Sequence, residues 1–150
     1  MTARWTGPSA SPMRGSVIVA EDDDLLREFF VVVLEHGGYQ VLPARDGQDA
    51  LDLLSAGGDV SVLITDIEMP RIDGLELACR ARQRRRELRV LYVSSWERAE
   101  VADRTVPGSR FLRKPCSPDT LLEAIAALQN SDGSHSTTPK VVVAESQQVP

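Results

Sequence analysis

The sequence predicts a single α/β domain whose core is an open, doubly wound parallel sheet of five strands. The first observation behind this prediction is that five short apolar runs alternate with segments of helical period. The second is that these runs are almost continuously apolar, as strands are when helices cover both faces of a parallel sheet. The third is the size of the chain, because 150 residues with 42% apolar residues can bury one core.

The five apolar runs are the predicted strands. In chain order they are residues 17–20, 40–42, 60–64, 90–93 and 110–112. The second run ends at Leu42-Pro43, and no chemically useful side chain follows it.

Segments between the runs have the 3.6-residue period of amphipathic helices. The first helix has the apolar stripe Leu25, Leu26, Phe29, Phe30, Val33 and Leu34, and the last has Leu121, Leu122, Ile125 and Leu128. Glycine pairs at 37–38 and 57–58 follow the first two helices, and residues 117–119, Ser-Pro-Asp, open the last one. The fourth helix, within 97–104, is expected to be short because it contains few large apolar residues.

The two ends of the chain differ from its centre in composition. Residues 1–15 and 131–150 are rich in Gly, Pro, Ser and Thr, so we expect flexible segments around a domain at 16–130. A formal net charge of −5 disfavours nucleic acid or an anionic membrane as the main partner. The chain has no long apolar run and no signal-peptide pattern, so we expect a cytoplasmic protein. Cys79 and Cys116 lack metal-binding spacing and are expected to be free thiols.

Polar residues follow four of the five predicted strands. Glu21 and Asp22 follow the first, Asp66 the third, Ser94 the fourth and Lys114 the fifth. Ligands of doubly wound sheets bind at the carboxyl ends of the strands, where the strand order reverses. A strand order of 2-1-3-4-5 places these four ends side by side, so their side chains are expected to converge on one pocket.

Each of these signals has a structural interpretation when it is taken alone. The four acids at 21–24 either cap the following helix, where they complement its dipole, or bind a cation. Asp23 and Asp24 are the expected cap and first-turn residues, which leaves the first two acids nearest the strand end. A single Asp, Ser or Lys at a strand end is more often a turn, loop or surface residue. Their joint occurrence at four different strand ends favours a functional site.

Phosphoryl transfer onto a carboxylate is the chemistry that fits this set. Mg²⁺ prefers hard oxygen ligands and is typically held by one or two carboxylates together with phosphoryl oxygens. Glu21, Asp22 and Asp66 supply such carboxylates. An aspartyl phosphate also needs groups that neutralise its charge and hold the product, and Ser94 and Lys114 are suitable.

These residues, with the motifs DIEMPRIDG around Asp66 and FLRKP around Lys114, resemble the receiver domain of bacterial two-component response regulators over residues 16–129. The resemblance implies a flavodoxin-like (βα)5 fold with strand order 2-1-3-4-5. It implies that Asp66 is the phosphoacceptor. It also implies that Glu21, Asp22, Asp66 and the backbone carbonyl of Glu68 hold Mg²⁺, or Mn²⁺ in its place.

The same resemblance assigns roles to the later motifs. Ser94 and Lys114 would bind the phosphoryl group, Phe111 would be the switch aromatic, and the Lys114–Pro115 peptide bond would be cis. Phe111 lacks the hydroxyl of the Tyr that is usual in the family, so a switch there must depend on ring packing. Ser95 replaces a smaller residue and could narrow access to the phosphoryl group.

Two more departures from the family pattern concern the first motif and one spacing. Glu21 is a longer carboxylate than the Asp that is commoner at its position. The interval from Ser94 to Lys114 is short for the family, so the fourth helix is expected to be stunted or irregular. This departure affects the expected signalling face and leaves the expected chemistry unchanged.

The resemblance implies a histidine kinase or histidine phosphotransfer protein as the phosphoryl donor. His36 and His135 do not have the setting of a donor histidine within this chain. A downstream protein would read the face made by the fourth helix, the fifth strand and the last helix. The chain would be no enzyme beyond its own phosphorylation and dephosphorylation. We expect no output domain after residue 130 and therefore a stand-alone receiver. A receiver from a hybrid sensor kinase and a degenerate docking receiver remain alternatives.

Two rival interpretations use other features. A phosphatase of the haloacid-dehalogenase type is suggested by the sequence DIE, but that family has its nucleophile on the first motif strand, and Asp66 follows the third. A basic run could form a nucleic-acid patch, but Glu87 interrupts it, and a solvated helix face is the expected structure. The run consists of Arg80, Arg82, Arg84, Arg85, Arg86 and Arg89.

Overall fold

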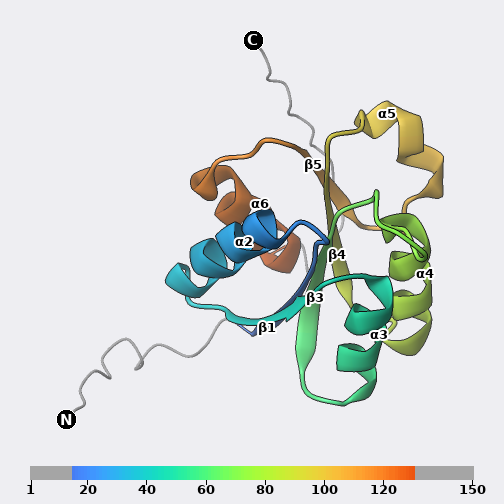
Figure 1. Cartoon of the computed structure of the whole chain (residues 1–150), viewed down its shortest axis with the longest axis horizontal. Helices are drawn as coiled ribbons and strands as arrows, with labels where there is room; N and C mark the ends of the chain where they lie inside the picture. The colour runs from blue at the N-terminus through green and yellow to red at the C-terminus, as the bar shows by residue number, and fades with distance from the viewer. Residues whose placement is uncertain (1–14, 131–150) are drawn as a thin grey trace.

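The computed structural model describes residues 15–130, so the terminal segments predicted to be flexible lie outside the described residues except for Gly15. One parallel sheet runs through the domain in the order β2-β1-β3-β4-β5 (Figure 1). Its strands are β1 Ser16–Ala20, β2 Gln40–Ala44, β3 Val60–Thr65, β4 Arg89–Ser94 and β5 Arg110–Arg113. The predicted doubly wound fold with strand order 2-1-3-4-5 is confirmed.

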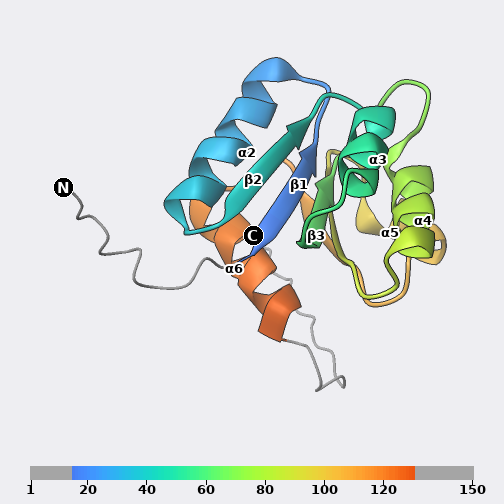
Figure 2. The same cartoon turned by 90° about the horizontal axis from the view of Figure 1, so that it is seen from below.

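Helices cover both faces of this sheet. They are α2 Asp24–His36, α3 Gly47–Ser55, α4 Gly74–Arg84, α5 Arg98–Val101 and α6 Pro118–Asn130, with a 3-10 turn η2 Ala102–Arg104 after α5. Figure 2 shows α2 and α6 on one side of the sheet and α3, α4 and α5 on the other. The fourth helix of the predicted series, α5, is only four residues long, as its composition and the short interval before Lys114 indicated.

The core consists of two apolar clusters, one on each face of the sheet. In β1, Val17 and Val19 belong to the cluster under α2 and α6, whereas Ile18 and Ala20 belong to the cluster under α3 and α4. Successive strand residues point to opposite faces. A strand that is covered on both sides is therefore apolar at every position, which explains the continuous runs in the sequence.

Helix ends follow the predicted capping pattern. Asp23 Oδ1 accepts the Leu26 N–H at the start of α2, and Ser117 Oγ accepts the Thr120 N–H at the start of α6. The predicted apolar stripe of α2 is wrong at Leu25, which is 80% exposed. Leu25 lies in the first turn, one turn before the buried part of the helix begins.

The second strand is longer than the sequence predicted. It passes through Pro43 and ends at Ala44, because β2 is an edge strand, where a residue without an N–H is tolerated. Both cysteines are free thiols, as expected. Within residues 15–130, no helix is both long enough and apolar enough to span a bilayer.

Candidate functional site

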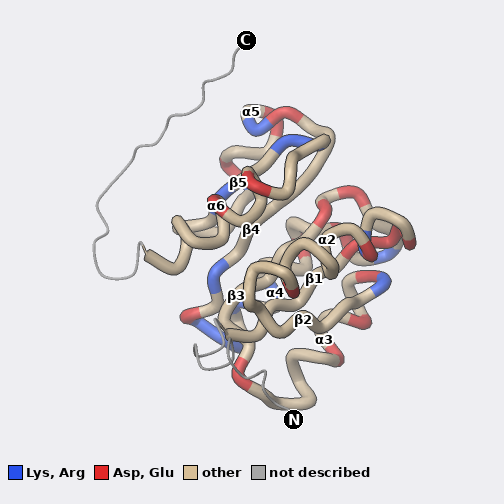
Figure 3. Tube along the Cα trace, turned by 90° about the vertical axis from the view of Figure 1, so that its left-hand side faces the viewer, with Lys and Arg blue, Asp and Glu red and all other residues tan. Residues whose placement is uncertain are grey.

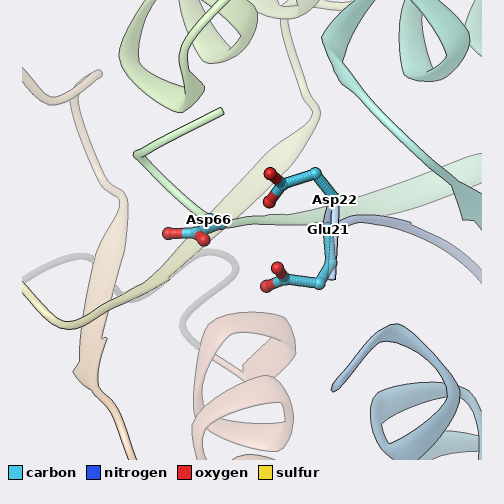
Figure 4. A group of neighbouring side chains, drawn as sticks. All are labelled: Glu21, Asp22 and Asp66. Carbon is cyan, nitrogen blue, oxygen red and sulfur yellow. The ribbon is translucent and has the colours of Figure 1, made fainter. Parts of the chain in front are cut away.

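Three carboxylates meet where β1 and β3 end (Figure 4). Glu21 and Asp22 follow β1 directly, and Asp66 follows β3. One carboxylate oxygen from each residue lies within 4.8 Å of the other two. Glu21 is 1% exposed and Asp66 is 8% exposed, whereas Asp22 faces solvent. The structure therefore brings together the three acids that the sequence singled out.

Backbone hydrogen bonds to neighbouring strands position the two buried acids, Glu21 and Asp66, which lie one residue past the ends of β1 and β3. The Glu21 N–H donates to the Ala44 carbonyl at 3.1 Å, and the Asp66 N–H donates to the Ala20 carbonyl, also at 3.1 Å. Because β1 and β3 are neighbours in the sheet, these bonds fix both acids at the same edge. The Glu21 carboxylate is held further by the Asp23 N–H, which donates to Oε2 at 3.1 Å.

Lys114 reaches the two buried acids from the end of β5. Its Nζ lies 2.9 Å from Asp66 Oδ2 and 3.2 Å from Glu21 Oε1. Burial alone would lower the pKa of Lys114, but its hydrogen bond to Asp66 and the charges of both acids raise it overall. Burial also raises the pKa of Glu21, and the charge of Asp66 adds to this rise against the opposing effects of the Asp23 amide and Lys114.

The four consecutive acids have two roles: Glu21 and Asp22 belong to the carboxylate cluster, whereas Asp23 and Asp24 interact with the first turns of α2. Asp23 caps α2, and Asp24 Oδ1 pairs with Arg27 Nη2 at 2.6 Å. Arg27 Nη1 also donates to the Glu21 carbonyl at 2.8 Å and so ties the helix to the backbone of the site. We did not predict this role for Arg27, although its position three residues after Asp24 in a helix was an available signal.

Ser94 and Lys114 lie beside each other at the same edge of the sheet. Ser94 is fully buried, its Oγ accepts the Trp96 N–H at 3.1 Å, and its carbonyl accepts the Lys114 N–H at 2.8 Å. Phe111 is half-buried and packs against the cluster under α3 and α4. The Lys114–Pro115 peptide bond is cis.

The loop after Asp66 is held close to the site. The Glu68 N–H donates to Asp66 Oδ1 at 3.3 Å. A Cβ on Gly74 would lie 1.9 Å from the Asp66 carbonyl oxygen, so only glycine fits there. Arg71 has a left-handed backbone with φ of 69° and forms an ion pair with Asp46, the N-cap of α3.

The donor set fits a small, hard dication. Two buried carboxylates and one exposed carboxylate face a single lysine, so the cluster has an excess of negative charge that a dication would offset. Oxygen donors are also the ligands that Mg²⁺ prefers. The Glu68 carbonyl, the fourth expected ligand, belongs to a residue whose N–H is already bonded to Asp66.

The basic run lies elsewhere and has mostly structural partners. Arg84, Arg85 and Arg89 donate hydrogen bonds to the backbone carbonyls of Leu51, Gly58 and Leu128. Arg80 forms an ion pair with Glu76 on α4. The expected solvated helix face is therefore wrong for Arg85 and Arg89, which are partly buried and lie outside α4, whereas Arg84 is exposed on that helix. Figure 3 shows where the basic and acidic residues lie along the chain.

The sequence model of one protein family, the response regulator receiver domain, matches residues 17–126. The chain belongs to this family. The receiver protein CpdR of Brucella abortus is 38% identical over 80 residues, which make up 53% of this receiver and 66% of CpdR. The response regulator MprA of Mycolicibacterium vanbaalenii is 32% identical over 114 residues, which make up 75% of this receiver and 49% of MprA.

The receiver also matches part of a kinase. The sensor kinase CckA of Brucella abortus is 32% identical over 114 residues, which make up 72% of this receiver and 12% of CckA. This receiver thus spans about half the length of MprA and a small part of CckA. A solved structure of TrrA from Thermotoga maritima in complex with Mg²⁺-BeF matches with a TM-score of 0.67 and 26% identity, covering 76% of this receiver and 98% of TrrA.

Proposed function

We propose that this receiver domain accepts a phosphoryl group on Asp66 in a Mg²⁺-dependent reaction, from a histidine of a kinase or a phosphotransfer protein. The placement of Asp66 carries the proposal. Its carboxylate is almost buried after β3, lies 2.9 Å from Lys114 Nζ and is clustered with Glu21 and Asp22. An Asp that served only as a turn residue would need neither the lysine nor the two other acids.

In the proposed transfer, an oxygen of the Asp66 carboxylate attacks the phosphorus of the donor phosphohistidine. The O–P bond forms as the N–P bond breaks, and the histidine nitrogen keeps the electron pair. Glu21, Asp22, Asp66 and the Glu68 carbonyl would hold Mg²⁺, which would supply positive charge to offset that of the phosphoryl oxygens. Mn²⁺ is expected to replace it. Lys114 and the Ser94 hydroxyl hold the product.

Labelling with a small phosphodonor tests the assignment of Asp66. Acetyl phosphate with Mg²⁺ should add one phosphoryl mass to the wild-type protein and none to Asp66→Asn. Asp52→Asn, which changes an exposed acid on α3, is the matched control and should be labelled normally. Labelling of Asp66→Asn would show that another residue is the acceptor. An unlabelled wild-type protein would favour a degenerate receiver that only docks.

We further infer that the chain catalyses only its own phosphorylation and dephosphorylation, and that it acts in the cytoplasm. A stand-alone receiver is the first candidate for the whole protein, supported by the match to the receiver protein CpdR. A receiver within a hybrid kinase is the second, supported by the match to a segment of CckA. Phosphotransfer from each histidine kinase of the source organism, compared by initial rate, would identify the donor and distinguish these candidates.

The proposed output is a change in the face formed by α5, β5 and α6, which a protein partner would read. A phosphoryl group adds about −1.5 to −2 charges and strong acceptor oxygens. A hydrogen bond from Ser94 to these oxygens would draw the loop after β4 toward Asp66. Phe111 lines a cavity of about 40 Å³ between α5 and β5, so its ring is not fully enclosed on that side.

Amide NMR tests the proposed output. Addition of beryllofluoride with Mg²⁺ should shift resonances in residues 94–104 and 110–122 of the wild-type protein, and Ser94→Ala should reduce these shifts. If only the loops around Asp66 respond, the receiver uses another surface or does not switch.

A further inference from the structure

Arg113 bridges the edge strand β5 and the loop that leaves β4. Its Nε donates to the Ser95 carbonyl at 3.3 Å, and its Nη1 lies 2.8 Å from Glu97 Oε2. Both partners follow Ser94 within three residues. Arg113 is also the residue directly before Lys114, which contacts Asp66. One segment of β5 therefore contacts both the site and the loop beside it.

We propose that Arg113 is a positioning residue that holds the loop 95–97 in its observed position and so opposes the movement of Ser94 toward a phosphorylated Asp66. The inference rests on the proposed function. In this role Arg113 shifts the equilibrium between two loop positions and does not contact the phosphoryl group.

The other contacts of this loop explain why one arginine can have this effect. The Ser94 carbonyl is fixed by the Lys114 N–H at 2.8 Å, so the start of the loop is anchored to β5. Beyond that point, the Ser94 hydroxyl accepts the Trp96 N–H, and Trp96 packs partly against the core. Within residues 15–130, the other hydrogen bonds and ion pairs between loop 95–97 and a strand are the two that Arg113 makes.

Movement of Ser94 toward Asp66 would pull Ser95 away from Arg113. The planar guanidinium donates to two acceptors in fixed directions, so a displaced loop cannot keep both. A conformational equilibrium shifts by the difference in contact free energy between its two states. Removal of Arg113 should therefore favour the position in which Ser94 lies closer to Asp66, which bound beryllofluoride would stabilise.

The size of the effect follows from the exposure of the pair. The side chains of Arg113 and Glu97 are 55% and 61% exposed, so solvent screens most of their attraction. Exposed pairs of this kind contribute little, and their removal changes an equilibrium constant by about two- to fivefold. Arg113→Ala should thus bind beryllofluoride about two- to fivefold more tightly than wild type.

The test measures beryllofluoride affinity of the full chain at saturating Mg²⁺ from the fluorescence of Trp96, in a Trp5→Phe background that leaves one tryptophan. Arg113→Ala should bind beryllofluoride more tightly than wild type. The affinity of Arg113→Lys should lie between those two, since lysine can pair with Glu97 but cannot also reach Ser95. Arg110→Ala removes an exposed arginine from the same strand and should leave the affinity unchanged.

A second variant protects the test against a folding defect in Arg113→Ala. Glu97→Gln removes the ion pair and keeps an oxygen that can accept the capping hydrogen bond of α5. It should tighten binding by a smaller factor, and the double variant should match Arg113→Ala alone. Unchanged or weaker binding by both single variants would overturn the role of Arg113. Wild-type protein that binds no beryllofluoride would instead overturn the proposed function.

Discussion

Replacement of Lys114 by methionine should destabilise the domain most when no divalent metal is present. Lys114 Nζ contacts Asp66 at 2.9 Å and Glu21 at 3.2 Å, and the side chains of both acids are at most 9% exposed. Removing one partner of a buried ion pair costs about 3–5 kcal/mol, because the other charge is left uncompensated. The two acids would then repel each other without an intervening cation.

Two features reduce this cost. The Lys114 side chain is 20% exposed, so water already screens part of the interaction. The pKa of Glu21 is raised, mainly by burial, so this acid can take up a proton once its cation is lost. We therefore expect the free energy of unfolding to fall by about 2–3 kcal/mol at neutral pH in the presence of a chelator.

Urea denaturation with and without Mg²⁺ measures this effect. Mg²⁺ should stabilise Lys114→Met more than wild type, because a ligand that binds the native state more tightly stabilises it more, and the variant site has one more unbalanced charge. Arg86→Met is the matched control, since it removes an exposed cation far from the acids and should change stability by less than about 0.5 kcal/mol. Equal stability of Lys114→Met and wild type in chelator would refute the reasoning. The reasoning would also be refuted if the difference in the free energy of unfolding between Lys114→Met and wild type were the same with and without Mg²⁺.

Four other substitutions test the packing of the domain by the same urea measurement. Gly74→Ala should cost about 3 kcal/mol or more, because its Cβ would lie 1.9 Å from the Asp66 carbonyl oxygen; a stable variant would mean that this backbone can adjust. Tyr92→Phe should cost about 1–3 kcal/mol, because a buried backbone N–H that donates to the Tyr92 hydroxyl at 3.1 Å would lose its acceptor. Leu34→Ala should cost about 2–5 kcal/mol and Leu25→Ala less than about 0.5 kcal/mol; similar losses would contradict the assigned burial.

The fold could be predicted because its signals are periodic. Strands covered on both faces give continuous apolar runs, and helices between them give stripes such as the buried Phe30, Val33 and Leu34. Ends of elements were less predictable. β2 extends past Pro43 because an edge strand tolerates the missing donor, and a sequence does not state which strand is at the edge.

The convergence of the acids and Lys114 could be predicted for a different reason. A strand order of 2-1-3-4-5 places the ends of β1, β3 and β5 at one edge, so residues far apart in sequence meet there. Contacts between side chains and loops could not be predicted in this way. The bonds from Arg27 to the Glu21 carbonyl and from Arg113 to the Ser95 carbonyl depend on the path of each loop, which leaves no periodic trace in the sequence.

The proline in β2 also limits how other chains can attach to this sheet. Gln40 donates to Gly15 and Ala44 accepts from Glu21, so the even-numbered residues of β2 are bonded toward β1 and the odd-numbered ones face outward. Pro43 is one of the outward residues and has no N–H to offer. Along β2, an incoming strand would find a single outward backbone donor, at residue 41, which is too few for a continuous ladder. Growth of the sheet by strand addition is therefore disfavoured at this edge, and contacts there must be made through side chains.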